Sequence, residues 1–128
     1  MIRSAAIQVG NLIKNMNLGF NDTNLFINKE IPEEMLQNKE FPMIQINTLP
    51  TNSHDYASNR KNFETVSCQV NVLVATNREV EKYHSLIEKN LSTHQFECFF
   101  DTQELDENYE VQRLILRFNK TQNIQEIF

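Results

Sequence analysis

An alternation of apolar and polar side chains over residues 66–74 sets the narrowest limits on the fold. The polar Ser67, Gln69 and Asn71 stand between apolar residues at every second position. Successive side chains of a strand point to opposite faces of a sheet, so this period of two predicts a half-buried strand over residues 63–75. One face belongs to a core and the other meets water or a partner. The core-facing residues are Val66, Cys68, Val70, Val72 and Val74.

Two amphipathic helices and three further strands are predicted around this strand. Residues 1–17 have apolar side chains three and four positions apart, which is typical of a helix with one buried face. A second helix begins at Thr76, which forms a capping box with Glu79, and ends near Ser92. The other strands are predicted at 42–49, 95–101 and 109–119, with Phe96, Cys98 and Phe100 facing the core in the second of them. A short extended piece within 25–27 and a short helix from Pro32 to Gln37 are also indicated.

The order of these elements, α-β-β-α-β-β, predicts an α+β fold. We expect one mostly antiparallel four-stranded sheet with both amphipathic helices packed on one face. With 128 residues, the chain 1–128 has the length of a single domain. The polar segment 51–62 is expected to be a flexible loop that becomes ordered on assembly, and 120–128 a C-terminal arm.

The rare residues exclude several classes of site. Only two glycines are present, Gly10 and Gly19, so a dinucleotide fingerprint, a P-loop and a nucleophile elbow are all impossible. A net charge of −5 argues against a dedicated nucleic-acid binder. No stretch approaches the roughly 20 apolar residues of a membrane span, and the polar start of the chain does not predict a secretory signal.

The residue types used in catalysis do not form a convincing active site. His54, Asp55 and Tyr56 are adjacent, but their small polar neighbours in the 51–62 loop offer no scaffold that would hold a general base. Cys68 is expected in the core rather than as a nucleophile. His84 and Glu88 lie one helical turn apart, yet two ligands are too few to specify a metal. We therefore expect no enzymatic activity, no cofactor and no metal.

Apolar residues on the face opposite the core predict a partner surface. Strand alternation places Leu73, Phe99 and Ile115 away from the core, and an apolar tail follows the last strand with Ile124, Ile127 and Phe128. These six residues are the predicted oligomer interface, unless the faces of the strands are misassigned. Within the 51–62 loop, His54, Asp55, Tyr56 and Arg60 are the candidate residues for a contact made during assembly.

The order of the segments resembles the tail-terminator (tail-completion) proteins of long-tailed bacteriophages. The resemblance runs from helix 1–17 and the strand PMIQIN, through the long polar loop, to the strand FETVSCQVNVLVAT. It continues with the helix NREVEKYHSLIEKNLS and the strands FECFFD and VQRLILRFN. The chain is most similar to minor tail proteins of siphophages and prophages of low-GC Gram-positive bacteria, which have a lambda-type tail-completion fold.

This resemblance implies a structural role in the virion. Such proteins are made in the host cytoplasm and form a ring that caps the tail tube and joins it to the head connector. By this resemblance we expect the ring to be a hexamer. They hold no cofactor, and DNA passes through the ring without specific binding, which suits an acidic chain. Two alternatives remain open: another head-tail connector or tail-tube subunit, and a small cytoplasmic ferredoxin-like ligand-binding domain.

Overall fold

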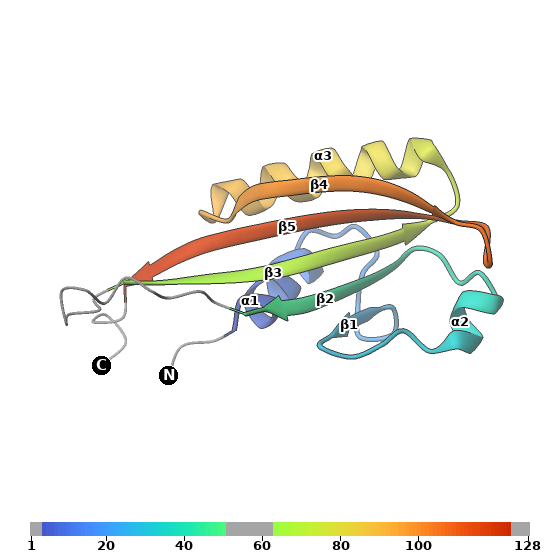
Figure 1. Cartoon of the computed structure of the whole chain (residues 1–128), viewed down its shortest axis with the longest axis horizontal. Helices are drawn as coiled ribbons and strands as arrows, with labels where there is room; N and C mark the ends of the chain where they lie inside the picture. The colour runs from blue at the N-terminus through green and yellow to red at the C-terminus, as the bar shows by residue number, and fades with distance from the viewer. Residues whose placement is uncertain (1–3, 51–62, 124–128) are drawn as a thin grey trace.

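The computed structural model describes residues 4–50 and 63–123 and has an α+β fold (Figure 1). Five strands form one sheet in the order β1-β2-β3-β5-β4, with β1 parallel to β2 and the other pairs antiparallel. The elements in chain order are α1 Ala5–Lys14, β1 Leu25–Ile27, α2 Glu33–Gln37, β2 Met43–Leu49, β3 Phe63–Val74, α3 Asn77–Thr93, β4 Glu97–Asp106 and β5 Val111–Asn123.

The α+β class agrees with the prediction, but the sheet has more strands, and the fold more helices, than the four and two that were predicted. The predicted four-stranded sheet gains β1 as a fifth strand, and α2 is a third helix among the described residues. Both additions are short, at three and five residues, so neither is long enough to carry a clear hydrophobic period. Because β1 pairs with β2 in parallel, the sheet is mixed rather than purely antiparallel.

The long strands β3 and β5 form the spine of the sheet. They pair continuously from Phe63 opposite Asn123 to Val74 opposite Gln112. The alternating apolar residues of β3 are all buried against the helices, as predicted. β5 continues to Asn123, beyond its predicted end at residue 119, so the predicted C-terminal arm 120–128 begins as strand.

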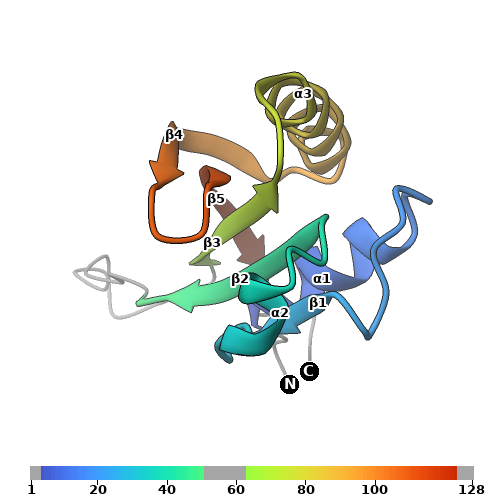
Figure 2. The ribbon, with the colours of Figure 1, turned by 90° about the vertical axis from the view of Figure 1, so that its right-hand side faces the viewer.

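Helices α1 and α3 cover the same face of the sheet, as predicted, with α1 over the β1–β2–β3 side and α3 over the β3–β5–β4 side (Figure 2). Gly10 lets α1 approach β1 closely, because a Cβ at this position would lie 2.7 Å from Cδ1 of Ile27. The N-terminus of α3 is capped by Thr76, whose hydroxyl accepts a hydrogen bond from the amide of Glu79 at 3.3 Å and donates one to its carboxylate at 3.0 Å.

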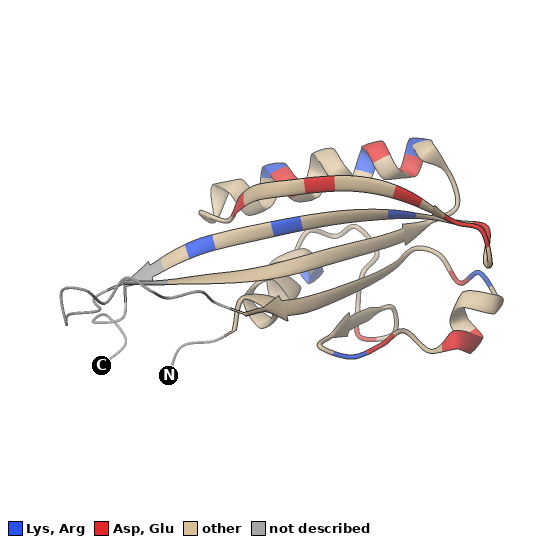
Figure 3. Cartoon of the chain, in the orientation of Figure 1, with Lys and Arg blue, Asp and Glu red and all other residues tan. Residues whose placement is uncertain are grey.

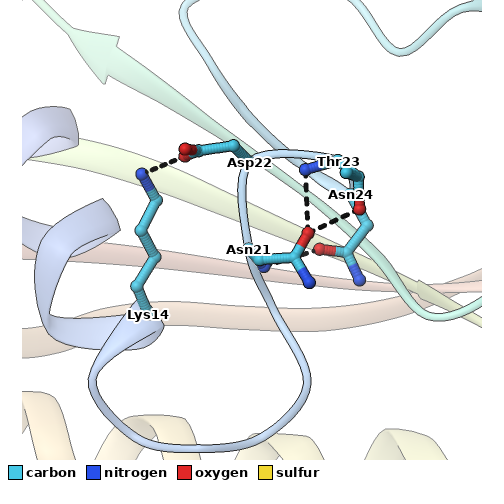
Figure 4. A network of polar contacts seen from close by, with 5 residues as sticks. All are labelled: Lys14, Asn21, Asp22, Thr23 and Asn24. Atoms are coloured by element: carbon cyan, nitrogen blue, oxygen red, sulfur yellow. Dashed lines mark hydrogen bonds and ion pairs between the residues drawn. The ribbon is translucent and has the colours of Figure 1, made fainter.

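A small polar network fixes the connection between α1 and β1 (Figure 4). Lys14 at the end of α1 forms an ion pair with Asp22, and this pairing lowers the pKa of the Asp22 carboxyl. The side-chain oxygen of Asn21 accepts hydrogen bonds from the amide and the hydroxyl of Thr23. Asn24 bridges two segments, since its side-chain nitrogen donates to the carbonyls of Gly19 at 3.0 Å and Pro42 at 3.2 Å. These bonds supply the turn that positions β1 beside β2.

Candidate functional site

Strand β4 is one of the two edge strands of the sheet and carries its most exposed large apolar side chains. Of the five large hydrophobic side chains that are well exposed among the described residues, Phe99, Phe100 and Leu105 belong to β4, at 51%, 42% and 56% exposure. The outer backbone groups of an edge strand have no partner within the sheet, so such a strand is a ready template for pairing with another chain. Apolar side chains and a free edge therefore coincide here.

A β-bulge at Phe99 changes which side chains of β4 lie on each face of the sheet. Cys98 pairs with Phe118 and Phe100 pairs with Arg117, so Phe99 is an extra residue between two successive pairs. Strict alternation placed Phe100 in the core, and that prediction is wrong because the bulge shifts the register. Phe96 is buried, while Phe100 lies beside Arg117, whose guanidinium carbon is 4.8 Å from the ring centroid. The run of apolar residues at 98–100 was the signal in the sequence for this break.

A chain of hydrogen-bonded side chains crosses the sheet face opposite α1 and α3. Gln45 accepts from Asn71 at 3.3 Å, and Asn71 in turn accepts from Gln69 at 3.0 Å. Gln69 also accepts from Nε of Arg117 at 2.9 Å, and Arg117 lies over Phe100. The chain thus joins β2, β3, β5 and β4, and Asn71 is buried within it at 8% exposure. These amides satisfy one another, which leaves a polar but ordered face rather than a loosely hydrated one.

One end of this same face is covered, which removes Leu73 from the predicted interface. Leu73 is only 2% exposed and packs with Met43 and Val111 in a second, smaller core. The segment containing α2 closes over it, and Tyr109 ties that segment to the β4–β5 turn by donating to the carboxylate of Glu33 at 3.1 Å. Strand alternation gave the correct face for Leu73, but the expectation that it is exposed is wrong because α2 lies on that face.

Of the remaining predicted interface and loop residues, the structure describes only Ile115 and Phe99. Ile115 lies on the open face opposite Asn71 and Thr102 and is half-buried. Phe99 is exposed on the bulge. The others lie outside the described residues: Ile124, Ile127 and Phe128 of the tail, and His54, Asp55, Tyr56 and Arg60 of the 51–62 segment. Sequence reasoning missed Phe100 and Leu105, the first because of the bulge and the second because the predicted strand ends at residue 101, whereas β4 continues to Asp106.

Charge is distributed unevenly between the two outer strands on this side of the sheet. β4 carries four acidic residues and no basic one, whereas its neighbour β5 carries Arg113, Arg117 and Lys120 (Figure 3). Arg113 pairs with Asp106 at 3.4 Å. The acidic residues of β4 are Glu97, Asp101, Glu104 and Asp106. Two copies of β4 placed side by side would therefore repel each other.

The two cysteines are free and are placed as small apolar residues. Cys68 is fully buried in the main core, and burial raises the pKa of its thiol to about 12. Cys98 is half-buried, its pKa is raised chiefly by burial, and its thiol donates to the carbonyl of Phe100 at 3.3 Å. A nucleophilic cysteine needs a depressed pKa and access to substrate, so the environment of Cys68 favours the predicted core role.

Asp101 joins the His84–Glu88 pair, which sequence reasoning had considered alone. Nε2 of His84 is 2.9 Å from a carboxylate oxygen of Glu88 and 3.5 Å from one of Asp101. The third group comes from β4, which packs beside α3 after a short turn. The sequence contained no spacing that pairs residue 101 with residue 84, because their proximity depends on the strand register.

One hollow on the surface lies where α1, the end of α3 and β5 meet. It has a volume of about 450 Å³, and Asn11, His94 and Lys120 are among its lining residues. Nδ1 of His94 lies 3.0 Å from the carbonyl of Asn90. Lys120 lies over the ring of Phe96 at 5.1 Å. None of the described residues that line this hollow carries a carboxylate.

Comparison with known proteins adds no family assignment: no protein-family model matches the chain, and no curated protein matches it. Among the described residues, no helix is both long and apolar enough to cross a membrane.

Proposed function

We propose that this chain is a structural assembly protein whose copies associate through the outer strand β4, in the manner of a phage tail terminator. The observation that carries the proposal is the coincidence on β4 of a free strand edge with the exposed Phe99, Phe100 and Leu105. Burying such side chains fully is worth roughly 1.5–3 kcal/mol each, and they are already about half buried, so a contact gains about 1 kcal/mol from each.

The charges of β4 favour a contact between unlike surfaces. Its four acidic residues would oppose each other in a two-fold pairing of β4 with β4. The partner must then present a different surface of the same chain, which makes the contact heterologous. A heterologous contact closes into a ring when its rotation allows, and otherwise produces an open filament. The bulge at Phe99 also opposes nonspecific pairing of this edge with other strands, because a bulge interrupts the regular row of backbone hydrogen-bonding groups.

The proposed role is a ring, hexameric by analogy, that ends the tail tube and contacts the head connector. The half-buried Ile115 and the tail residues Ile124, Ile127 and Phe128 remain part of the proposed interface, and Leu73 does not. The net charge of −5 supports a ring that lets DNA pass, because like charge opposes binding. The proposal includes no catalysis and no cofactor in this role, and it places the protein in the virion.

Electron microscopy of the purified full chain tests this role against its closest rival. Closed rings of uniform diameter are the expected result for a terminator. Long tubes would assign the chain to the tail-tube subunits instead. Monomeric particles at every concentration would contradict both structural roles and favour the third alternative, a small ligand-binding domain that uses the hollow near His94 and Lys120.

A further inference from the structure

Three metal-ligating side chains converge where α3 packs beside β4. His84 and Glu88 lie one turn apart on α3, and Asp101 comes from the strand. One donor atom from each residue lies within 4.8 Å of the other two. The side chains are 33%, 45% and 55% exposed, so the cluster lies at the surface, with the two carboxylates more open to solvent than the imidazole.

The spacing of the donor atoms fits a small divalent ion. Zinc bonds to imidazole nitrogen and carboxylate oxygen are about 2.0–2.2 Å long, so neighbouring donors of a tetrahedral site lie roughly 3.3–3.5 Å apart. The distances from Nε2 of His84 are 2.9 Å to Glu88 and 3.5 Å to Asp101. Both distances are close to that spacing, and the three donor atoms all lie within 4.8 Å of one another, so side-chain adjustments alone could bring them around one ion.

The state of the His84 ring points to a ligand as well. Its Nε2 has less than 1 Å² of exposed surface and no hydrogen bond of acceptable geometry, despite the two nearby carboxylates. A shielded nitrogen without a hydrogen bond is costly unless something else satisfies it. The carboxylates of Glu88 and Asp101 also repel each other at this separation, and a cation among the three groups removes both costs.

We propose that His84, Glu88 and Asp101 bind a divalent transition-metal ion of the zinc class. One imidazole with two carboxylates suits zinc better than magnesium or calcium, which prefer oxygen donors alone. Three protein ligands leave a fourth position for water or for a group from outside the chain. The ion would tie the middle of α3 to the strand that carries Phe99 and Phe100, and so stabilise this part of the sheet edge.

Calorimetric titration of the full chain with Zn²⁺ tests the site. We expect one ion per chain, and at least a tenfold weaker affinity in His84→Gln and in Asp101→Asn. The matched control is His94→Gln, which changes the histidine that caps the C-terminus of α3 and lies outside the cluster. Cys98→Ser controls for thiol binding nearby. Both controls should keep the affinity of the unmodified chain.

Thermal unfolding with and without Zn²⁺ supplies a second readout. The ion should raise the unfolding midpoint of the unmodified chain and of His94→Gln, and leave that of His84→Gln unchanged, because only a ligand that binds the folded state shifts the midpoint. Circular dichroism of each variant verifies that it is folded. The proposal is overturned if Zn²⁺ binds without saturation, or if His94→Gln or Cys98→Ser loses as much affinity as His84→Gln.

Discussion

Cys68 illustrates how packing sets the chemistry of a single residue. Its side chain occupies a position in the middle of the alternating apolar face of β3 and has no exposed surface. The same burial holds the pKa of the thiol at about 12, far above its ordinary value of 9.0. The thiolate is the reactive form, so the buried residue should be chemically inert in the folded protein.

Alkylation at pH 8 measures this inertness directly. With iodoacetamide under native conditions, Cys98 should be modified more slowly than a free thiol, and Cys68 should remain unmodified over the same period. In denaturant the two should react at similar rates. Peptide mass spectrometry reports each site separately. Equal native rates at the two cysteines would contradict the placement of Cys68 in the core.

The same thiol should make the fold less stable in alkaline solution. The folded state keeps a proton that the unfolded chain releases above pH 9, so the contribution of Cys68 is intact below pH 9 and declines as pH rises toward 12. The loss is at most about 1.4 kcal/mol per pH unit. Urea unfolding at several pH values checks it, with Cys68→Ala expected to show a shallower decline. Identical slopes for the two proteins would rule the effect out.

At the scale of elements, α2 is a short helix with a large effect on the sheet. It covers only one end of the open face, yet it converts Leu73 from an exposed residue into part of a second core with Met43 and Val111. Helices of five residues depend on such tertiary contacts, since isolated short helices are unstable in water.

Truncating Leu73 should therefore be costly. Leu73→Ala is expected to lower the free energy of unfolding by about 2–5 kcal/mol, the range for buried leucine positions. Leu105→Ala, at an exposed position of the edge strand β4, should change it by less than about 0.5 kcal/mol. Denaturant melts of the two variants provide the comparison. A small effect at Leu73 would mean that α2 does not pack on the sheet in solution.

Gly10 gives the packing of α1 on β1 a separate test. Gly10→Leu must displace the side chain of Ile27 and is expected to cost about 1–3 kcal/mol through overpacking. Gly10→Ala should cost less, because alanine gains about 1 kcal/mol of helix propensity and its one close contact is with the flexible end of the Ile27 side chain. Thermal melts rank the two variants. Equal stability of Gly10→Leu and the unmodified chain would show that α1 stands further from β1.

The sequence predicted the long elements well because their hydrophobic periods are long. β3 was predicted from a period of two over nine residues, and α3 from the Thr76 cap and the apolar stripe that follows it. β4 could not be predicted in the same way. The strand contains three consecutive apolar residues, Cys98, Phe99 and Phe100. The bulge at Phe99 reverses the face on which each following side chain lies. A local pattern cannot show which of two adjacent phenylalanines is the extra residue.

At the scale of the whole molecule, the candidate site depends on which strand lies at the edge. The sheet order puts β4 outermost although β5 ends the described chain, and no local feature of either segment fixes that order. Residue types alone predicted a partner surface and named Phe99 correctly as exposed. They could not predict that α2 removes Leu73 from this surface or that Leu105 is an exposed residue of the edge strand β4, because both outcomes depend on long-range packing.

Sedimentation velocity over a range of concentrations tests the central claim that copies of the chain associate through β4. The intact chain should sediment as a discrete oligomer, well above its 15.1 kDa monomer mass. The double variant Phe99→Glu with Leu105→Glu should sediment as a folded monomer, because it adds charge to an acidic edge and removes its apolar contacts. Ile7→Glu, which changes an exposed apolar residue on α1, should assemble like the intact chain. An intact chain that remains monomeric at all concentrations, or a double variant that assembles as the intact chain does, would contradict the account.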